Sequence, residues 1–172
     1  TGCPTLAPTG GLTDGGTITG PTGEYRVCTL PVTFDTDDTL PFIDGLLYEI
    51  QDTVTVGDDE GFSSTDTEVT LTIEPGSIFF AQAASALIVN RGNEIDASGT
   101  PTMPIVFTSR DNVQGLNTDN SQAQWGGIVL LGRAPVSDCQ DLIFNTPGNP
   151  TANATCQQRL EGSATTCFFG GG

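Results

Sequence analysis

The sequence predicts an all-β protein whose short strands wind into a solenoid, and the main evidence lies between Val69 and Gly132. The apolar runs in this stretch are about three to six residues long, rich in β-branched residues and closed by Gly, Pro, Asn or Asp. A strand, a turn and another short strand recur about every ten residues, and a full cycle takes about twenty. A single coil of this kind cannot bury its apolar face alone, so we expect successive coils to stack.

Alternation within each run predicts which side chains face the interior. Residues at every second position are expected to point inward and to stack on like residues of the next coil, ~4.8 Å away. The side chains expected inside are Leu71, Ile73, Ile105, Phe107, Ile128 and Leu130. Thr70, Thr72 and Glu74 are expected to point outward. Burial of each apolar side chain would stabilise the fold by roughly 1.5–3 kcal/mol.

Four motifs follow one another in this stretch: LTIEPG at 71–76, ALIV at 86–89, PIVFTS at 104–109 and WGGI at 125–128. Together they resemble a family of bacterial secreted or surface-attached proteins, many of them lipoproteins and most without an assigned function. The resemblance covers residues 46–136. It implies a right-handed parallel β-helix and a secreted, extracellular or outer-cell-surface location. It implies no reaction and supplies no catalytic motif.

Composition along the chain predicts an N-terminal extended arm over residues 1–23 and one parallel β-helix domain over residues 24–172. The arm is mostly Gly, Thr and Pro, and it lies either on its own domain or on a neighbour. Strands outside the central stretch are expected at 17–19, 25–34 with a break at Pro31, 40–43, 46–50, 53–56 and 142–144. Polar inserts at 57–67 and 110–124 are expected to project from the side that often binds ligands.

Nothing after Leu160 resembles a capping helix, although the last coil of a solenoid exposes apolar side chains and an unpaired strand edge. Two interpretations stay open. The domain is the N-terminal part of a longer solenoid, which the family resemblance favours, or another copy covers its end. Stacking of copies through the solenoid end and the arm would give a homo-oligomer or a filament.

The protein is strongly acidic, with 21 Asp and Glu residues against 5 arginines, no His and a formal net charge of -16. This charge argues against nucleic acid and anionic membrane surfaces as partners, because both need clustered cations. No run of about 18 apolar residues occurs, so no transmembrane segment is expected. No signal peptide is visible, and we expect that a secreted protein has already lost it.

The five cysteines predict disulfides, because the chain has neither His nor a C-x-x-C pair for a zinc site. Cys139 and Cys156 bracket a loop whose closure would stabilise the fold by about 3 kcal/mol. A Cys3–Cys28 bond would tie the arm to the first strand, whereas a lipoprotein-type N-terminus would leave Cys3 lipidated. Cys167 is left over, and it is either free or paired with a residue outside this chain.

Acidic turns are the only groups with the character of metal ligands. They contain Asp35, Asp37, Asp38, Asp58, Asp59 and Glu60. Calcium prefers oxygen ligands from flexible loops, and such turns supply them. Neither turn has the D-x-D-x-D-G spacing of a calcium loop, however, and solvated turns explain the same residues. Calcium is the one cofactor that the sequence leaves open.

Polysaccharide hydrolases and lyases occur among parallel β-helices, so carbohydrate chemistry is the main alternative. Hydrolysis would need two carboxylates at a fixed separation, and Glu74, Glu94 and Asp96 form no evident pair. Arg91 and Arg133 would suit a lyase, but turn arginines that pair with acidic neighbours explain them more simply. A Ser or Cys nucleophile would lack its usual His base.

The leading functional prediction is an extracellular structural protein that acts in self-assembly or adhesion, for example as a filament subunit, without enzymatic activity. It rests on the uncovered solenoid end, the arm, the left-over Cys167 and the lack of a catalytic set. The alternative is a β-helix that binds or cleaves polysaccharide, with a surface glycan as partner. Trp125, the single Trp, would stack on a sugar in that case or pack a coil corner beside its two following glycines.

Overall fold

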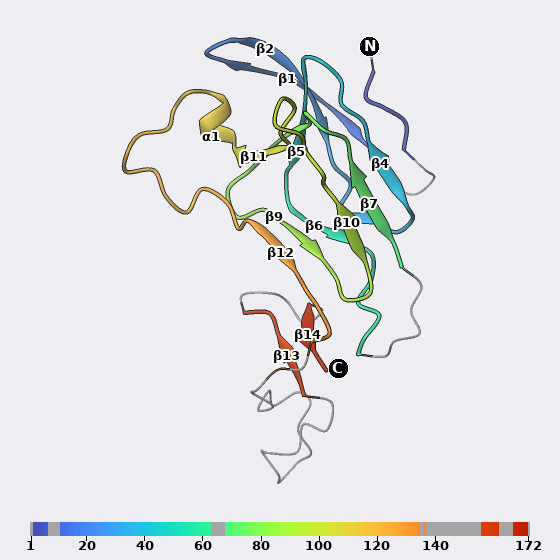
Figure 1. Cartoon of the computed structure of the whole chain (residues 1–172). Helices are drawn as coiled ribbons and strands as arrows, with labels where there is room; N and C mark the ends of the chain where they lie inside the picture. Colours follow the sequence, from blue (N-terminus) through green and yellow to red (C-terminus); the bar gives the residue numbers. More distant parts are fainter. Residues whose placement is uncertain are drawn as a thin grey trace.

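Three parallel sheets form the body of the protein, and the chain passes through them in turn (Figure 1). The computed structural model describes residues 2–6, 11–62, 68–134, 136, 156–161 and 167–171. The first sheet contains, in spatial order, β1 (Thr13–Gly20), β2 (Gly23–Thr29), β5 (Leu46–Ile50), β8 (Ile78–Ala81) and β11 (Val106–Ser109). The second contains β3 (Thr33–Phe34), β6 (Thr53–Val56), β9 (Ala86–Val89) and β12 (Ile128–Leu130). The third contains β4 (Asp38–Leu40), β7 (Thr70–Ile73) and β10 (Glu94–Asp96).

From β2 to β12, each strand lies parallel to the strand one coil earlier in its sheet. Arg26 pairs with Leu46, twenty positions later, which is the predicted length of a coil. Later coils are longer because they carry the inserts, and Leu87 therefore pairs with Ile128. The prediction of an all-β protein is confirmed. No helix in the described ranges is long and apolar enough to span a membrane.

Proline sets two of the strand boundaries. The predicted strand at 25–34 is divided at Pro31 into β2 and β3, which lie in different sheets. The predicted strand at 40–43 is wrong, because β4 ends at Leu40, directly before Pro41. The proline ring removes the N–H that a central strand needs for its ladder. Local backbone chemistry thus decides where the chain turns from one sheet to the next.

The interior between the sheets is filled by the side chains that alternate inward. Leu71 and Ile73 are almost fully buried, Thr70 and Thr72 between them are half-buried, and Glu74 is exposed, as the alternation predicted. Parallel, in-register pairing places each inward residue on the equivalent residue of the coil before it. The packing of the core therefore repeats from coil to coil.

An aromatic stack illustrates this repeat. The rings of Tyr48 and Phe79 lie 5.1 Å apart between centroids, and those of Phe79 and Phe107 lie 4.6 Å apart. The three side chains come from β5, β8 and β11, which are neighbours in the first sheet. Stacked rings in this range contribute about 0.5–1.5 kcal/mol beyond the burial of their area.

The last described coil has an exposed edge at β12. Ile128 and Leu130 pair with the buried residues Leu87 and Val89, so they take inward positions in the register. They are nevertheless 40% and 66% exposed. The expectation that they lie inside is therefore correct for their direction and wrong for their burial, because no described strand pairs with the outer edge of β12.

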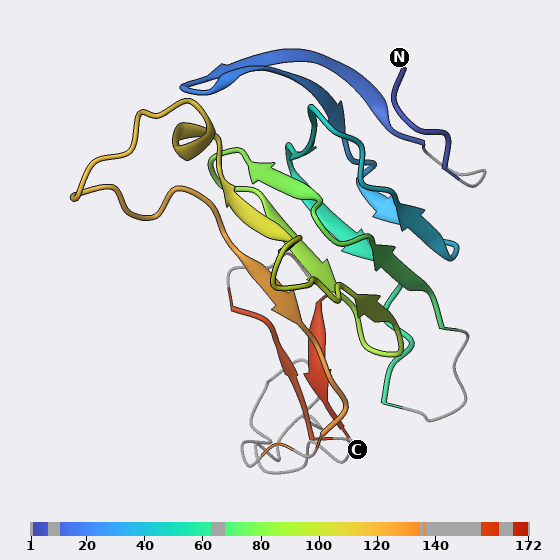
Figure 2. The same ribbon diagram turned by 45° about the horizontal axis from the view of Figure 1, so that its top comes forward.

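The N-terminal segment lies on its own domain. β1 is longer than the predicted strand at 17–19 and pairs antiparallel with β2 at the edge of the first sheet, which Figure 2 shows as a long hairpin. Cys3 forms a disulfide with Cys28, and Leu6 and Leu12 pack against the main core. The disulfide excludes the alternative in which Cys3 carries a lipid, because its sulfur is already bonded.

A short antiparallel hairpin, β13 (Gln157–Arg159) and β14 (Phe168–Gly170), packs beside the second sheet (Figure 1). Leu160, Cys167 and Phe169 cover the outward side of β9 and β12 through contacts with Ile88 and Val129. The N–H of Gly170 donates to the carbonyl oxygen of Gly132 at 2.8 Å. The strand predicted at 142–144 lies outside the described residues.

Candidate functional site

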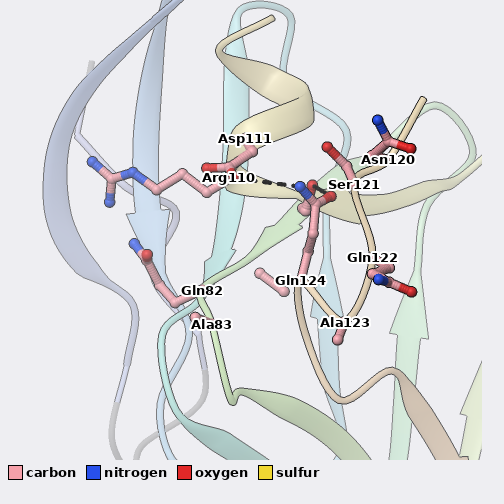
Figure 3. A pocket seen from close by; sticks show the side chains of 11 residues that line it. Gln82, Ala83, Arg110, Asp111, Asn120, Ser121, Gln122, Ala123 and Gln124 are labelled. Carbon is pink, nitrogen blue, oxygen red and sulfur yellow. Dashed lines mark hydrogen bonds between the residues drawn. The ribbon is translucent and has the colours of Figure 1, made fainter. Parts of the chain in front are cut away.

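A polar pocket of about 450 Å³ lies between the turn after β8 and the insert after β11 (Figure 3). Its volume falls within the ~300–1,000 Å³ of small-molecule sites. It is lined by Ala81, Gln82, Ala83, Ser109, Arg110, Asp111 and residues 120–124. Ala81 pairs with Ser109 in neighbouring strands, so the residues that follow them leave the sheet side by side. The register of two adjacent coils thus creates the pocket.

The insert begins with a short helix, α1 (Arg110–Val113), which the sequence analysis did not predict. The Oγ of Ser109 accepts from the N–H of Asn112 at 3.2 Å and so caps this helix. The same hydroxyl donates to Oε1 of Gln124 at 2.6 Å. Nε2 of Gln124 donates to Asn117 at 2.7 Å and to Asp111 at 3.3 Å, the latter drawn in Figure 3. These bonds join the two ends of the insert and hold the pocket wall.

The N-terminal hairpin packs against the insert. Val113 packs against a small core formed by Ile18, Val27, Leu47 and Phe80. A Cβ at Gly20 would clash with the carbonyl oxygen of Val113. A Cβ at Gly115 would lie 2.6 Å from Cγ of Pro21. Glycine at both positions therefore permits the close contact between the hairpin and the insert.

Glu49 of β5 is a buried carboxylate beside the pocket. Its Oε2 accepts from Oγ1 of Thr29 at 2.7 Å, and its Oε1 accepts from Nε2 of Gln82 at 2.5 Å. Nη1 of Arg110 lies 3.9 Å from the same Oε1. These residues come from four successive coils, and the stacking of β2, β5, β8 and β11 aligns them. Gln82 and Arg110 thus link the pocket to a fixed charge.

The chemistry of this pocket is hydrogen bonding. Its lining offers the amides of Gln82, Asn120, Gln122 and Gln124 and the hydroxyls of Ser109 and Ser121. Amides and hydroxyls both donate and accept, which suits a ligand rich in hydroxyl groups. The arrangement therefore favours recognition of a polar ligand.

A protein-family model described as a pectate-lyase-like beta helix domain matches residues 32–156. The chain belongs to this family of β-helix domains. The match agrees with the three parallel sheets and with the resemblance to parallel β-helix proteins found in the sequence. No curated protein and no solved structure matches the chain.

The acidic turns of this β-helix domain make bonds within the protein. Oδ1 of Asp37 accepts from the N–H of Thr70 at 2.8 Å, and Asp38 is buried in β4. The Asp59 carboxylate binds the guanidinium of Arg91. Asp35 and Asp58 are exposed, and Glu60 is half-buried. Among the described residues, no three or more His, Cys, Asp or Glu side chains gather to hold a metal ion, and calcium stays a prediction.

The carboxylates considered for catalysis lie apart from the pocket. Glu74 follows β7, and its Oε2 accepts from the N–H of Phe42 at 2.9 Å. Glu94 and Asp96 are exposed on β10, and Asp96 accepts from Oγ of Ser98 at 2.8 Å. None of the three lines the pocket.

The two arginines considered for a lyase also have roles within the fold. Arg91 is buried and pairs with Asp59, and Nε of Arg133 donates to the carbonyl oxygen of Gly61 at 2.9 Å. Both therefore contact the first insert, and Arg91 pairs with an acidic residue there, as the simpler interpretation predicted for it. Trp125 is half-buried and packs against the main core, which supports its predicted place at a coil corner.

The structure describes four of the five cysteines, and it contains the predicted bond between Cys3 and Cys28. Cys3 and Cys28 are bonded, with their Cα atoms 5.7 Å apart, and Cys156 is also in a disulfide. Cys139 lies outside the described residues. Cys167 is a free, buried thiol that packs against Ile88 and Leu131.

Glu49, Gln82, Arg110 and Gln124 were not identified as site residues from the sequence. The prediction that 110–124 projects as a binding insert was the one available signal for this region. Glu49 stands in the apolar run LLYEI at 46–50, where its charge is unusual. Its contacts with Thr29 and Gln82 depend on coil register, which a single sequence does not specify.

Proposed function

We propose that this β-helix domain binds polysaccharide and that sugar residues occupy the pocket between β8 and the 110–124 insert. The observation that carries the proposal is the concentration of amides and hydroxyls in a pocket of about 450 Å³. Membership of a family described by its likeness to pectate lyase supports it, because pectate is a polysaccharide. This function was the alternative in the sequence analysis. Neither the comparisons nor the pocket supports the leading prediction of a structural or adhesive role.

Substitution of Ala83 tests this proposal. Ala83 is exposed and lines the pocket, so Ala83→Trp would fill the cavity while removing no side-chain hydrogen bond. Ala97 is also exposed but lies after β10, outside the lining, and Ala97→Trp is the matched control. Affinity electrophoresis against a panel of soluble polysaccharides should detect binding by the wild type and by Ala97→Trp. Binding should weaken by about tenfold or more in Ala83→Trp, which corresponds to ~1.4 kcal/mol.

Equal retention of binding by both Trp variants would place the glycan elsewhere and contradict the pocket assignment. Absence of binding to every polysaccharide would contradict the function. The same mixtures should be assayed for new reducing or unsaturated chain ends. Their appearance would show cleavage in addition to binding.

Self-assembly is a second candidate, and the open edge of the last described coil favours it. Ile128 and Leu130 expose apolar surface beside an edge of β12 with which no described strand pairs, and such an edge readily accepts another strand. Negative-stain electron microscopy over a range of concentrations would test it. Fibres of constant width should form in the wild type and disappear in Leu130→Lys. Dispersed particles under all conditions would contradict assembly.

We also infer a right-handed winding of the coils and a secreted or outer-surface location. Connections between parallel strands of one sheet are right-handed in about 98% of cases, which supports the winding. The Cys3–Cys28 disulfide supports an oxidising compartment outside the cytosol. An experimental structure would decide the winding, and fractionation of the native cells would decide the location.

A further inference from the structure

One guanidinium and two carboxylates lie at or beside the pocket. Among the described residues that line the pocket, Arg110 is the only cation and Asp111 the only anion. Glu49 stands next to the lining and supplies the second carboxylate. The protein as a whole has a formal net charge of -16. The pocket is therefore locally negative within a negative molecule.

Glu49 is held more firmly than Arg110. It is only 8% exposed, and Thr29 and Gln82 each donate to one of its oxygens. The Arg110 side chain is 47% exposed, and its closest carboxylate oxygen is Oε1 of Glu49, at 3.9 Å. Figure 3 shows Arg110 extending away from the 120–124 side of the pocket, toward the side of Gln82. The buried carboxylate thus lies on the side of the pocket toward which the partly exposed guanidinium points.

The charges around Arg110 bear on which sugars the pocket can accept. A uronate carboxylate is best bound by a free guanidinium, through two parallel hydrogen bonds. Glu49 lies 3.9 Å from the Arg110 guanidinium and offsets part of its charge, and Asp111 presents a like charge to an incoming carboxylate. A neutral sugar avoids this repulsion and uses the amides of Asn120 and Gln122 and the hydroxyl of Ser121.

We infer that the pocket selects uncharged sugar residues and rejects uronates, and that Glu49 contributes to this preference by offsetting the charge of Arg110. The inference rests on the proposed function. Specificity of this kind is a difference between two affinities and uses repulsion as well as attraction. The ligand would differ from the one in the family's description, because pectate is a polyuronate.

Titration calorimetry with short oligosaccharides of equal length tests the inference. The probes are neutral cello-, xylo- and manno-oligosaccharides and an oligogalacturonate, each with calcium and with a chelator. We expect the wild type to bind one of the neutral probes about tenfold more tightly than the oligogalacturonate. Raising the salt concentration should narrow this difference, because salt screens the repulsion.

Two variants test the role of the carboxylates. Glu49→Gln and Asp111→Asn should each raise the ratio of uronate to neutral affinity by about tenfold, since each removes one negative charge near Arg110. Asp111 is exposed, so Asp111→Asn should fold normally and can test the inference even if Glu49→Gln does not fold. Asp96→Asn, an exposed acid on β10 outside the lining, is the control and should leave the ratio unchanged.

The outcomes separate the two proposals. Tighter binding of oligogalacturonate than of every neutral probe, with or without calcium, would overturn the selectivity while polysaccharide binding stands. An unchanged ratio in both variants would overturn the role of the carboxylates. No binding of any probe would overturn the proposed function and this inference together.

Discussion

Arg91 is the most deeply buried charged side chain in the described part of the chain, with 1% of its surface exposed. Its Nε and Nη2 donate to the two oxygens of Asp59 at 2.7 and 2.6 Å. Nη1 donates to Oε1 of Gln157 at 2.7 Å and to the carbonyl oxygen of Gly170 at 3.0 Å. The guanidinium also lies 5.9 Å from the ring centre of Phe168. One side chain therefore joins the first insert, β9 and the C-terminal hairpin.

We expect Arg91→Ala to lower the free energy of unfolding by about 3–5 kcal/mol, because it leaves the Asp59 carboxylate without its partner. Arg26→Ala is the control, since Arg26 pairs with Asp14 at the surface, where 33% and 62% of the side chains are exposed. Loss of that exposed pair should cost about 1 kcal/mol or less. Urea unfolding measures both, and equal losses would contradict the structural role of Arg91.

Tyr48 links stability to pH. Burial, and then the nearby Glu74 carboxylate, raise the pKa of Tyr48 well above its ordinary value. Its hydroxyl donates to the carbonyl oxygen of Pro41 at 2.6 Å. The folded state holds the proton of the Tyr48 hydroxyl more tightly than the unfolded state. The contribution of this hydroxyl to the free energy of unfolding is therefore fully present below the unfolded pKa of about 10 and is lost as the pH rises above it.

Thermal melts should therefore show the Tm of the wild type falling as the pH rises above about 10. Tyr48→Phe has no proton to lose and should show a shallower fall. It should also have a lower Tm at neutral pH, because the hydrogen bond to Pro41 is worth about 0.5–1.5 kcal/mol. Parallel curves for the two proteins at alkaline pH would contradict the assignment to Tyr48.

Among the secondary-structure elements, the hairpin of β1 and β2 supports the 110–124 insert. Gly20 lies against the carbonyl oxygen of Val113, and any Cβ there would displace α1. Gly20→Ala should destabilise the protein by about 1–3 kcal/mol, the usual cost of forcing atoms into a packed site. It should also weaken polysaccharide binding, because Arg110 and Asp111 belong to the displaced helix.

Gly11 offers a matched control for this substitution, because a Cβ at Gly11 meets no atom within 4 Å. Gly11→Ala should leave both unfolding and binding close to wild type. Chemical denaturation and affinity electrophoresis would be measured on the same preparations. If Gly20→Ala behaves like Gly11→Ala, the hairpin does not brace the insert.

The whole molecule carries a formal net charge of -16, and this charge opposes the compact state. Added salt screens such repulsion, and the Debye length shortens from 30 Å at 0.01 M to about 8 Å at 0.15 M. We expect the Tm to rise mainly over this range of sodium chloride and to change little beyond it. A flat response there would show that repulsion among the carboxylates is not a significant cost.

Calcium binding can be tested separately through the thermal stability of the whole protein. If the acidic turns bind it, millimolar calcium should raise the Tm more than sodium chloride of equal ionic strength, and a chelator should reverse the effect. An identical response to the two salts would remove calcium from the set of ligands.

Several elements could be predicted because their causes are local. The alternation around Leu71 and Ile73 identified the buried face, since strand side chains point to opposite sides at successive residues. The break at Pro31 followed from the missing N–H. The pocket could not be predicted in the same way. It depends on Glu49, Gln82 and Arg110, which approach one another only when three coils stack in one register.

The sequence by itself determined the all-β class, the break at Pro31 and the alternation that buries Leu71 and Ile73, because periodicity and turn residues act over a few positions. Tertiary structure decided that the strands from β2 to β10 fall in sets of three, one in each parallel sheet, that Ile128 and Leu130 stay exposed, and that Arg91 is buried. It also decided which polar side chains meet at the pocket. These features depend on contacts between residues 20 to 79 positions apart, such as Thr29 with Glu49 and Arg91 with Gly170. Inserts of unequal length set the spacing of such contacts, and only the folded chain brings them together.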